Sequence, residues 1–143
     1  MVLLPGQTQL AKARLKPTKS TDTVEWITSD PTVATVDEKG LVSAKGQGLA
    51  TIYCIADSGV ESSFEVIVLA LNSTNIRIEQ YDSYVLDVFG ATEGIKWYTN
   101  NNRIATVDRN GNVIGRGIGT TTITAKVNGK ILYCKVTVTK LKR

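Results

Sequence analysis

Apolar and polar residues alternate one by one along most of this chain. From Ala11 to Lys16, alanine and leucine alternate with lysine and arginine, so one side of an extended strand would be apolar and the other charged. Near the end of the chain, Val136 and Val138 alternate with threonines in the same way. Because successive side chains of a strand point to opposite faces, this period of two predicts strands with one buried face and one face in water.

Short polar residues and glycines separate the alternating runs. Residues 37–40 and 108–111 each end in glycine, at the position where a tight hairpin requires a positive φ. Asn128–Gly129 is the strongest short hairpin motif in the chain. The polar residues at 29–31 and 100–102 predict caps on single helical turns, since their side chains can satisfy exposed backbone N–H groups.

Together, these patterns predict an all-β chain of short strands. The expected strands are 8–16, 23–28, 33–37, 41–45, 49–56 and 61–70 in the first half, and 75–79, 84–89, 94–99, 104–108, 112–116, 120–127 and 130–140 in the second. Seven short strands with regularly spaced turns predict a β-sandwich. The first half has one strand fewer. Either Val2–Leu4 is the remnant of its opening strand, or the chain was cut from something longer.

The two halves repeat each other at an offset of 71 residues. The segment that begins at Trp26 returns at Trp97, and the match runs without a gap to Ile52 and Ile123. A repeat of this length predicts two domains in tandem, each the size of a small self-standing domain. We place the first domain at 1–71, lacking or clipped in its opening strand, and the second at 72–143.

Charge divides unevenly between the halves. Residues 1–71 have a net charge of −2 and residues 72–143 one of +6. Nucleic-acid-binding modules cluster cations with stacking aromatic rings, whereas these cations alternate with core residues along strands. We interpret them as solvated strand faces and expect no nucleic-acid partner. No run approaches the roughly 20 apolar residues of a membrane-spanning helix, so we expect no membrane insertion.

The start of the chain does not have the features of a signal peptide. Met1–Pro5 has neither the basic region nor the cleavage site of a secretory signal peptide. Any export signal would therefore lie on a larger, multidomain chain.

Each half contains one cysteine in phase with neighbouring core residues. Cys54 follows Ile52 by two positions, and Cys134 precedes Val136 by two. A small apolar side chain with a weak donor suits such a site. The pattern predicts two buried, free thiols rather than a disulfide.

The aromatic residues divide into expected core and expected surface positions. Trp26 and Trp97 are in phase with Val24 and Ile95, so we predict that they fill the two cores and do not stack on sugars. The other aromatic side chains considered for the surface are Tyr53, Tyr81, Tyr84, Phe89 and Tyr98. They are scattered along the sequence, and no carbohydrate site is apparent from their distribution.

Candidate catalytic chemistry is sparse. The chain has no histidine, and its 13 acidic residues form no distinctive local motif, so we expect no enzyme, no catalytic residue and no cofactor. Asp30, Asp37 and Glu38 could supply oxygen atoms to a calcium ion. Against this, Asp37 precedes a turn glycine, where an Asx-turn explains it without a metal, and Glu38 is replaced by Arg109 in the second copy. We therefore assign no metal site.

These residues resemble the group 2 bacterial immunoglobulin-like domains. The family signature has a tryptophan, a polar turn, Val-Ala-Thr-Val-Asp, a turn glycine, and a glycine pair before an Ala-Thr-Ile strand. The chain has these features at Trp26, 29–31, 33–37, Gly40, Gly46, Gly48 and 50–52, and again at Trp97, 100–102, 104–108, Gly111, Gly117, Gly119 and 121–125.

The resemblance implies two tandem immunoglobulin-like sandwiches of the intimin and invasin kind. It implies a non-catalytic spacer or adhesive module of a bacterial surface or secreted protein, located outside the cell. Protein or glycan partners on a host or cell surface would follow. The alternatives are a decoration domain on a phage head or tail, and a glycan-binding accessory module of a secreted glycoside hydrolase.

Overall fold

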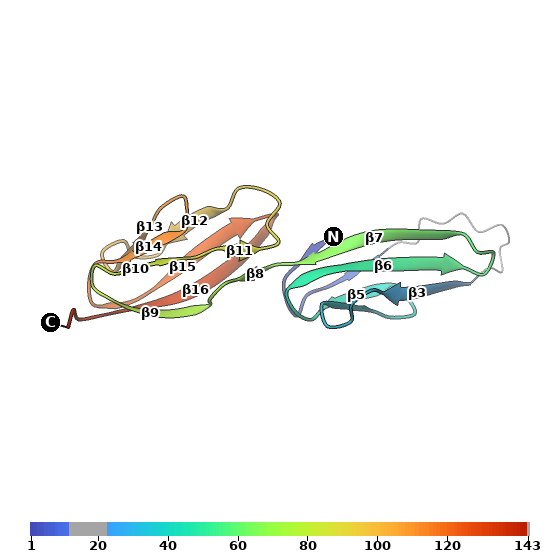
Figure 1. The fold of residues 1–143 in the computed structure, drawn as a ribbon, viewed down its shortest axis with the longest axis horizontal. Helices are drawn as coiled ribbons and strands as arrows, with labels where there is room; N and C mark the ends of the chain where they lie inside the picture. Colours follow the sequence, from blue (N-terminus) through green and yellow to red (C-terminus); the bar gives the residue numbers. More distant parts are fainter. Residues whose placement is uncertain (12–22, 143) are drawn as a thin grey trace. The chain divides into compact units, whose positions relative to one another are not determined.

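The computed structural model describes residues 1–11 and 23–142, whose regular elements are all β-strands (Figure 1). The chain divides into two compact units, Met1–Leu69 and Ala70–Arg143. The boundary expected from the sequence, between residues 71 and 72, falls two residues later. Within the described ranges, no helix has the length and apolar character needed to cross a membrane.

The first unit is a sandwich of a four-stranded and a three-stranded sheet. One sheet has the order β1-β7-β6-β3, with β1 at Val2–Leu3, β7 at Glu61–Val68, β6 at Gly48–Ala56 and β3 at Val24–Thr28. The other has the order β2-β5-β4, with β2 at Thr8–Leu10, β5 at Leu41–Ala44 and β4 at Ala34–Val36. The strand expected at 8–16 is seen only as β2, and residues 12–16 lie outside the described part of the chain.

The second unit repeats this arrangement and adds a two-stranded pair. Its larger sheet has the order β12-β15-β16-β9, from Lys96–Thr99, Gly119–Val127, Lys130–Thr139 and Asn75–Glu79. Its smaller sheet has the order β10-β14-β13, from Ser83–Val85, Asn112–Gly115 and Ala105–Val107. The additional pair joins β8 (Ala70–Leu71) to β11 (Val88–Phe89).

One expected strand of the second unit is interrupted. The segment predicted as a single strand over 84–89 forms β10 and then β11, which pair with different strands. Asn72 lies at the change of partner, because its amide donates to the Val85 carbonyl and accepts from the Asp87 N–H. A contact with a residue 13 to 15 positions away is not encoded in the local alternation, which is why the sequence predicted a continuous strand.

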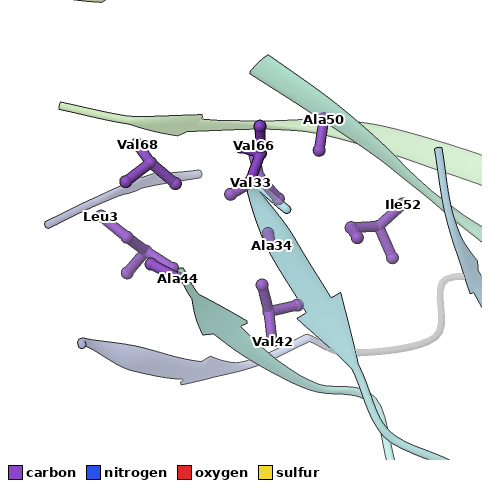
Figure 2. Close-up of a cluster of buried hydrophobic side chains, with 9 residues drawn as sticks. All are labelled: Leu3, Val33, Ala34, Val42, Ala44, Ala50, Ile52, Val66 and Val68. Atoms are coloured by element: carbon purple, nitrogen blue, oxygen red, sulfur yellow. The ribbon is translucent and has the colours of Figure 1, made fainter. Parts of the chain in front are cut away.

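The first unit does have an opening strand. β1 pairs parallel with β7, with Val2 opposite Ile67, as β9 pairs parallel with β16 in the second unit. Leu3, only 1% exposed, lies opposite Val68 in this pairing (Figure 2). Val2–Leu3 therefore occupies the place of the opening strand, as the first of the two explanations expects.

The cores consist of the residues that the alternation placed on the inner strand faces. In the first unit, nine buried side chains form one cluster (Figure 2): Leu3, Val33, Ala34, Val42, Ala44, Ala50, Ile52, Val66 and Val68. Ile52 and its counterpart Ile123 are both fully buried. At about 25 cal/mol per Å² of apolar surface removed from water, such clusters supply the main stabilisation of each sandwich.

Candidate interaction surface

The acidic residues considered as calcium ligands bind their own loops. The Asp37 carboxylate accepts hydrogen bonds from the N–H groups of Lys39 and Leu41, both at 2.9 Å, which confirms the Asx-turn. Asp30 accepts hydrogen bonds from the hydroxyl and backbone N–H of Thr32, and these lower the pKa of its carboxyl. Within residues 1–11 and 23–142, no three His, Cys, Asp or Glu side chains group in a way that could hold a metal ion.

The thiols are free and buried, as predicted. Burial raises the pKa of both Cys54 and Cys134 above the ordinary thiol value. A raised pKa leaves little thiolate at neutral pH, so neither sulfur is suited to nucleophilic chemistry.

The two tryptophans are only half-buried, so the prediction that they fill the cores is correct in part. Trp26 packs against the edge of the first core rather than within it. Its ring lies against Gly40, and the Trp97 ring lies against Gly111 in the same way. Each indole therefore packs against the glycine of its own turn.

Exposed aromatic and basic side chains gather on the outer face of the larger sheet in the second unit. The strand register places Tyr98, Thr124 and Tyr133 in one row across β12, β15 and β16. Tyr98 is 47% exposed and Tyr133 59% exposed. The Lys126 ammonium lies 5.2 Å from the centre of the Tyr98 ring, within the range of a cation–π contact.

The five aromatic side chains named from the sequence lie apart from one another, and the partner of Tyr98 in this row is a sixth, Tyr133. Tyr133 is not among the side chains expected at the surface, although it lies between the buried Leu132 and Cys134 and therefore faces outward. Its alignment with Tyr98 depends on strand pairing across residues 35 positions apart, which no local pattern shows. Tyr81 and Phe89, also exposed, lie outside this sheet.

We call this outer surface of the second unit the basic face. It comprises Arg77, Lys96, Tyr98, Lys126, Ile131, Tyr133 and Lys135, all exposed, on β9, β12, β15 and β16. A shallow groove at one end is lined by Lys96, Tyr98, Lys126 and Ile131 together with Glu93. Glu93 is fixed there because its carboxylate accepts the N–H of Asn128 in the adjacent hairpin.

The equivalent surface of the first unit, which we call the acidic face, has a different chemistry. It comprises Glu25, Ile27, Tyr53, Ile55, Glu61 and Glu65, on β3, β6 and β7. Register places Glu25, Ile55 and Glu61 in one row and Ile27 beside Tyr53 in the next. The four strands of this sheet contain no lysine or arginine. Repeated frameworks therefore present unlike surfaces.

Comparison with known proteins identifies similar sequences. The model of the bacterial Ig-like domain (group 2) matches residues 1–68 and again residues 70–138. An uncharacterized protein of Clostridium acetobutylicum is 28% identical over 156 aligned residues, covering 97% of this chain and 16% of that protein. The chain therefore spans about a sixth of the length of this relative.

Solved structures similar to this chain include a surface layer protein and a fragment of intimin. The surface layer protein SbsC, domains 1–6, is 21% identical, with 84% of this chain and 20% of that chain covered and a TM-score of 0.45. A C-terminal 282-residue fragment of intimin, in complex with the intimin-binding domain of the translocated intimin receptor, is 18% identical. That match covers 91% of this chain and 56% of the fragment, with a TM-score of 0.45.

Proposed function

Because this chain belongs to the bacterial Ig-like domains of group 2, we propose that it is a non-catalytic structural and adhesive module of a bacterial surface or secreted protein. In this role it is one part of a larger multidomain chain and lies outside the cell. It holds the functional parts of that chain at a distance from the envelope and contributes protein contacts of its own.

The pairing of the first and last strands of each unit supports this proposal. β1 runs parallel to β7 in the first unit, and β9 runs parallel to β16 in the second. Tension applied through the two ends of a unit pulls such strands past each other in opposite directions. The ladder hydrogen bonds are then loaded together in shear, rather than opened one after another from an end. A spacer that transmits force between a cell and a surface needs this property.

The second unit has the longer ladder of this kind. Five residue pairs join β9 to β16, from Lys135–Asn75 to Thr139–Glu79, whereas two pairs join β1 to β7. We expect both units to resist extension and the second to resist a higher force. At up to roughly 3.6 Å per extended residue, unfolding should lengthen the chain by up to about 250 Å for the first unit and about 270 Å for the second, less the folded length of each.

Single-molecule extension of the chain between its termini tests the load-bearing role. We expect two separate unfolding events of similar length, the weaker one from the first unit. Ile76→Pro and Ile78→Pro would each remove one backbone N–H of β9. Where that N–H bonds to β16, the substitution should lower the unfolding force of the second unit and leave that of the first unit unchanged. Extension without a force peak from either unit would contradict the proposal.

Labelling of cells tests the proposed location. An antibody raised against the chain should bind intact cells of the organism that carries it, or recognise the protein in the culture medium. Labelling that requires lysis would exclude a surface or secreted role. The neighbouring sequence on the parent chain separates this role from a phage virion domain, for which the same load-bearing geometry would be useful.

The row formed by Tyr98 and Tyr133 supports a second candidate, a glycan-binding accessory module. Two strand spacings separate the rings by about 10 Å, and flat exposed rings on one face can stack on sugar rings. Calorimetric titration with soluble polysaccharides tests this candidate, with Tyr98→Ala/Tyr133→Ala as the variant and Tyr81→Ala as the control. Binding that the double variant leaves unchanged would exclude the row as a glycan site.

A further inference from the structure

The acidic and basic faces occupy the same place on the two repeats but have opposite charge. Glu25 of the first unit corresponds to Lys96 of the second. Glu25 pairs with Ile55 and Lys96 with Lys126, and both members of the second pair lie 71 positions after those of the first. Glu65 corresponds to Lys135 by the pairing of equivalent strands. The framework is retained at these positions while the charge is reversed, so the contrast belongs to the surfaces and not to the folding of the sheets.

The charged side chains on each face are nearly all of one sign. The acidic face presents three glutamates, Glu25, Glu61 and Glu65, and the strands of that sheet have no basic side chain. The basic face presents Arg77, Lys96, Lys126 and Lys135, and the one acidic residue on its strands is Glu79. Faces of opposite sign attract each other, and each repels a second copy of itself.

Apolar side chains lie between the charges on both faces. On the acidic face, Ile27 is 41% exposed. On the basic face, Ile131 is 42% exposed and lies on the same face as the two tyrosines. An apolar centre within a charged rim is the usual composition of a protein–protein contact. The charged rim sets which surfaces meet, and the apolar centre supplies the surface removed from water.

We propose that the basic face of the second unit docks on the acidic face of the first unit of another copy of this chain. Three strands spaced about 4.8 Å apart and five residues of about 3.3 Å each give a footprint of roughly 250 Å² per face. One such contact is well below the roughly 1,200 Å² of a stable interface, so the association is weak and transient. On a cell surface, where copies are crowded, repeated weak contacts of this kind would align neighbouring molecules laterally.

Sedimentation of the full chain at up to about 1 mM tests the proposal. We expect concentration-dependent association at about 0.02 M salt, weakened at least about tenfold at 0.5 M, where the Debye length is only a few ångströms. Glu25→Lys/Glu65→Lys leaves two lysines beside Glu61 on the first face, and Lys96→Glu/Lys135→Glu balances the four charges named on the second face, so each double variant loses the attraction between the two faces. Each double variant alone should remain monomeric.

Mixing the two double variants supplies the decisive measurement. The first double variant keeps the original basic face and the second keeps the original acidic face, so we expect the equimolar mixture to recover the association that each variant lacks alone. This recovery excludes misfolding as the cause of the loss in each variant. Glu38→Lys/Asp82→Lys and Lys39→Glu/Arg109→Glu make the same changes in net charge in exposed turns outside both faces, and they should retain association.

Three results would overturn the proposal. The first is a monomer at every concentration and salt, and the second is a mixture of the double variants that remains monomeric. The third is association that depends on Lys96 and Lys135 but not on Glu25 and Glu65. That pattern would show that the basic face binds another part of the chain and not the acidic face.

Discussion

Replacement of Gly111 by alanine should destabilise the second unit strongly. Gly111 ends the turn after β13 with a φ of +80°, and a Cβ atom built there would lie 2.3 Å from the Leu86 carbonyl oxygen. The same atom would lie 3.0 Å from the Trp97 ring. The neighbouring backbone cannot simply move away, because the Leu86 N–H donates to the Gly111 carbonyl at 2.8 Å.

Three costs combine at this position. A left-handed backbone costs an alanine roughly 1–2 kcal/mol relative to glycine. Displacement of the Leu86 segment weakens a backbone hydrogen bond worth about 0.5–1.5 kcal/mol. Crowding against the Trp97 ring adds an overpacking cost of about 1–3 kcal/mol. We expect Gly111→Ala to lower the free energy of unfolding of the second unit by about 3–5 kcal/mol.

Gly129→Ala is the matched control. Gly129 also has a positive φ, +73°, but a Cβ atom there would meet no atom within 4 Å. Only the conformational cost of roughly 1–2 kcal/mol should appear. The difference between the two variants, about 2–3 kcal/mol, therefore isolates the close approach of the Leu86 backbone and the Trp97 ring.

Urea unfolding monitored by tryptophan fluorescence provides the assay. The chain has two tryptophans, one in each unit, so a Trp26→Phe background leaves Trp97 as the reporter of the second unit. The midpoint should fall further for Gly111→Ala than for Gly129→Ala, at similar slope. Equal losses would refute the reasoning, since they would show that only the sign of φ matters at Gly111.

Three other predictions concern stability and reactivity. Thr121→Val should stabilise the second unit by about 1 kcal/mol, because the buried Thr121 hydroxyl has no hydrogen-bond partner among the described residues. The equivalent position of the first unit is the apolar Ala50, and a loss of stability in urea unfolding would contradict this prediction. A thiol reagent should label the native protein slowly and modify two thiols per chain in denaturant, and native labelling should accelerate only at a higher pH than that of an exposed cysteine, because burial raises the pKa of both thiols. Rapid labelling of the native protein at neutral pH would show that the thiols are accessible. The first unit, with its two-residue opening strand, should be less protected from amide exchange than the second; equal or greater protection in a monomeric sample would show that strand length does not limit its stability.

Local sequence features predicted most of the secondary structure. The strands at 24–28, 41–44 and 75–79 lie within a residue or two of their expected bounds, because alternation follows from the two faces of a strand. Asp37 and Asp108 hold their turns as predicted, since an Asx-turn involves only residues two to four positions apart.

The candidate surface could not be predicted to the same extent. The alternation of buried and exposed residues along their strands indicates that Tyr133 and Lys126 face outward. No local pattern indicates that Tyr98 lies in the same row as Tyr133. The cations of the basic face, Arg77, Lys96, Lys126 and Lys135, face solvent, as the alternation predicts. Their collection on one sheet, opposite in sign to the equivalent sheet of the first unit, depends on which strands pair.

The sequence by itself determined that the chain is all-β, where its turns lie and that it contains the same module twice. Each of these properties follows from side-chain periodicity, backbone preferences of glycine, or identity at a fixed offset. Only the tertiary structure decided that Val2–Leu3 pairs parallel with β7, that the segment 84–89 changes partner, and that the tryptophans stay half-buried against their turn glycines. These features arise from strand register and close packing between residues far apart in the chain, and such contacts have no periodic signature in the sequence.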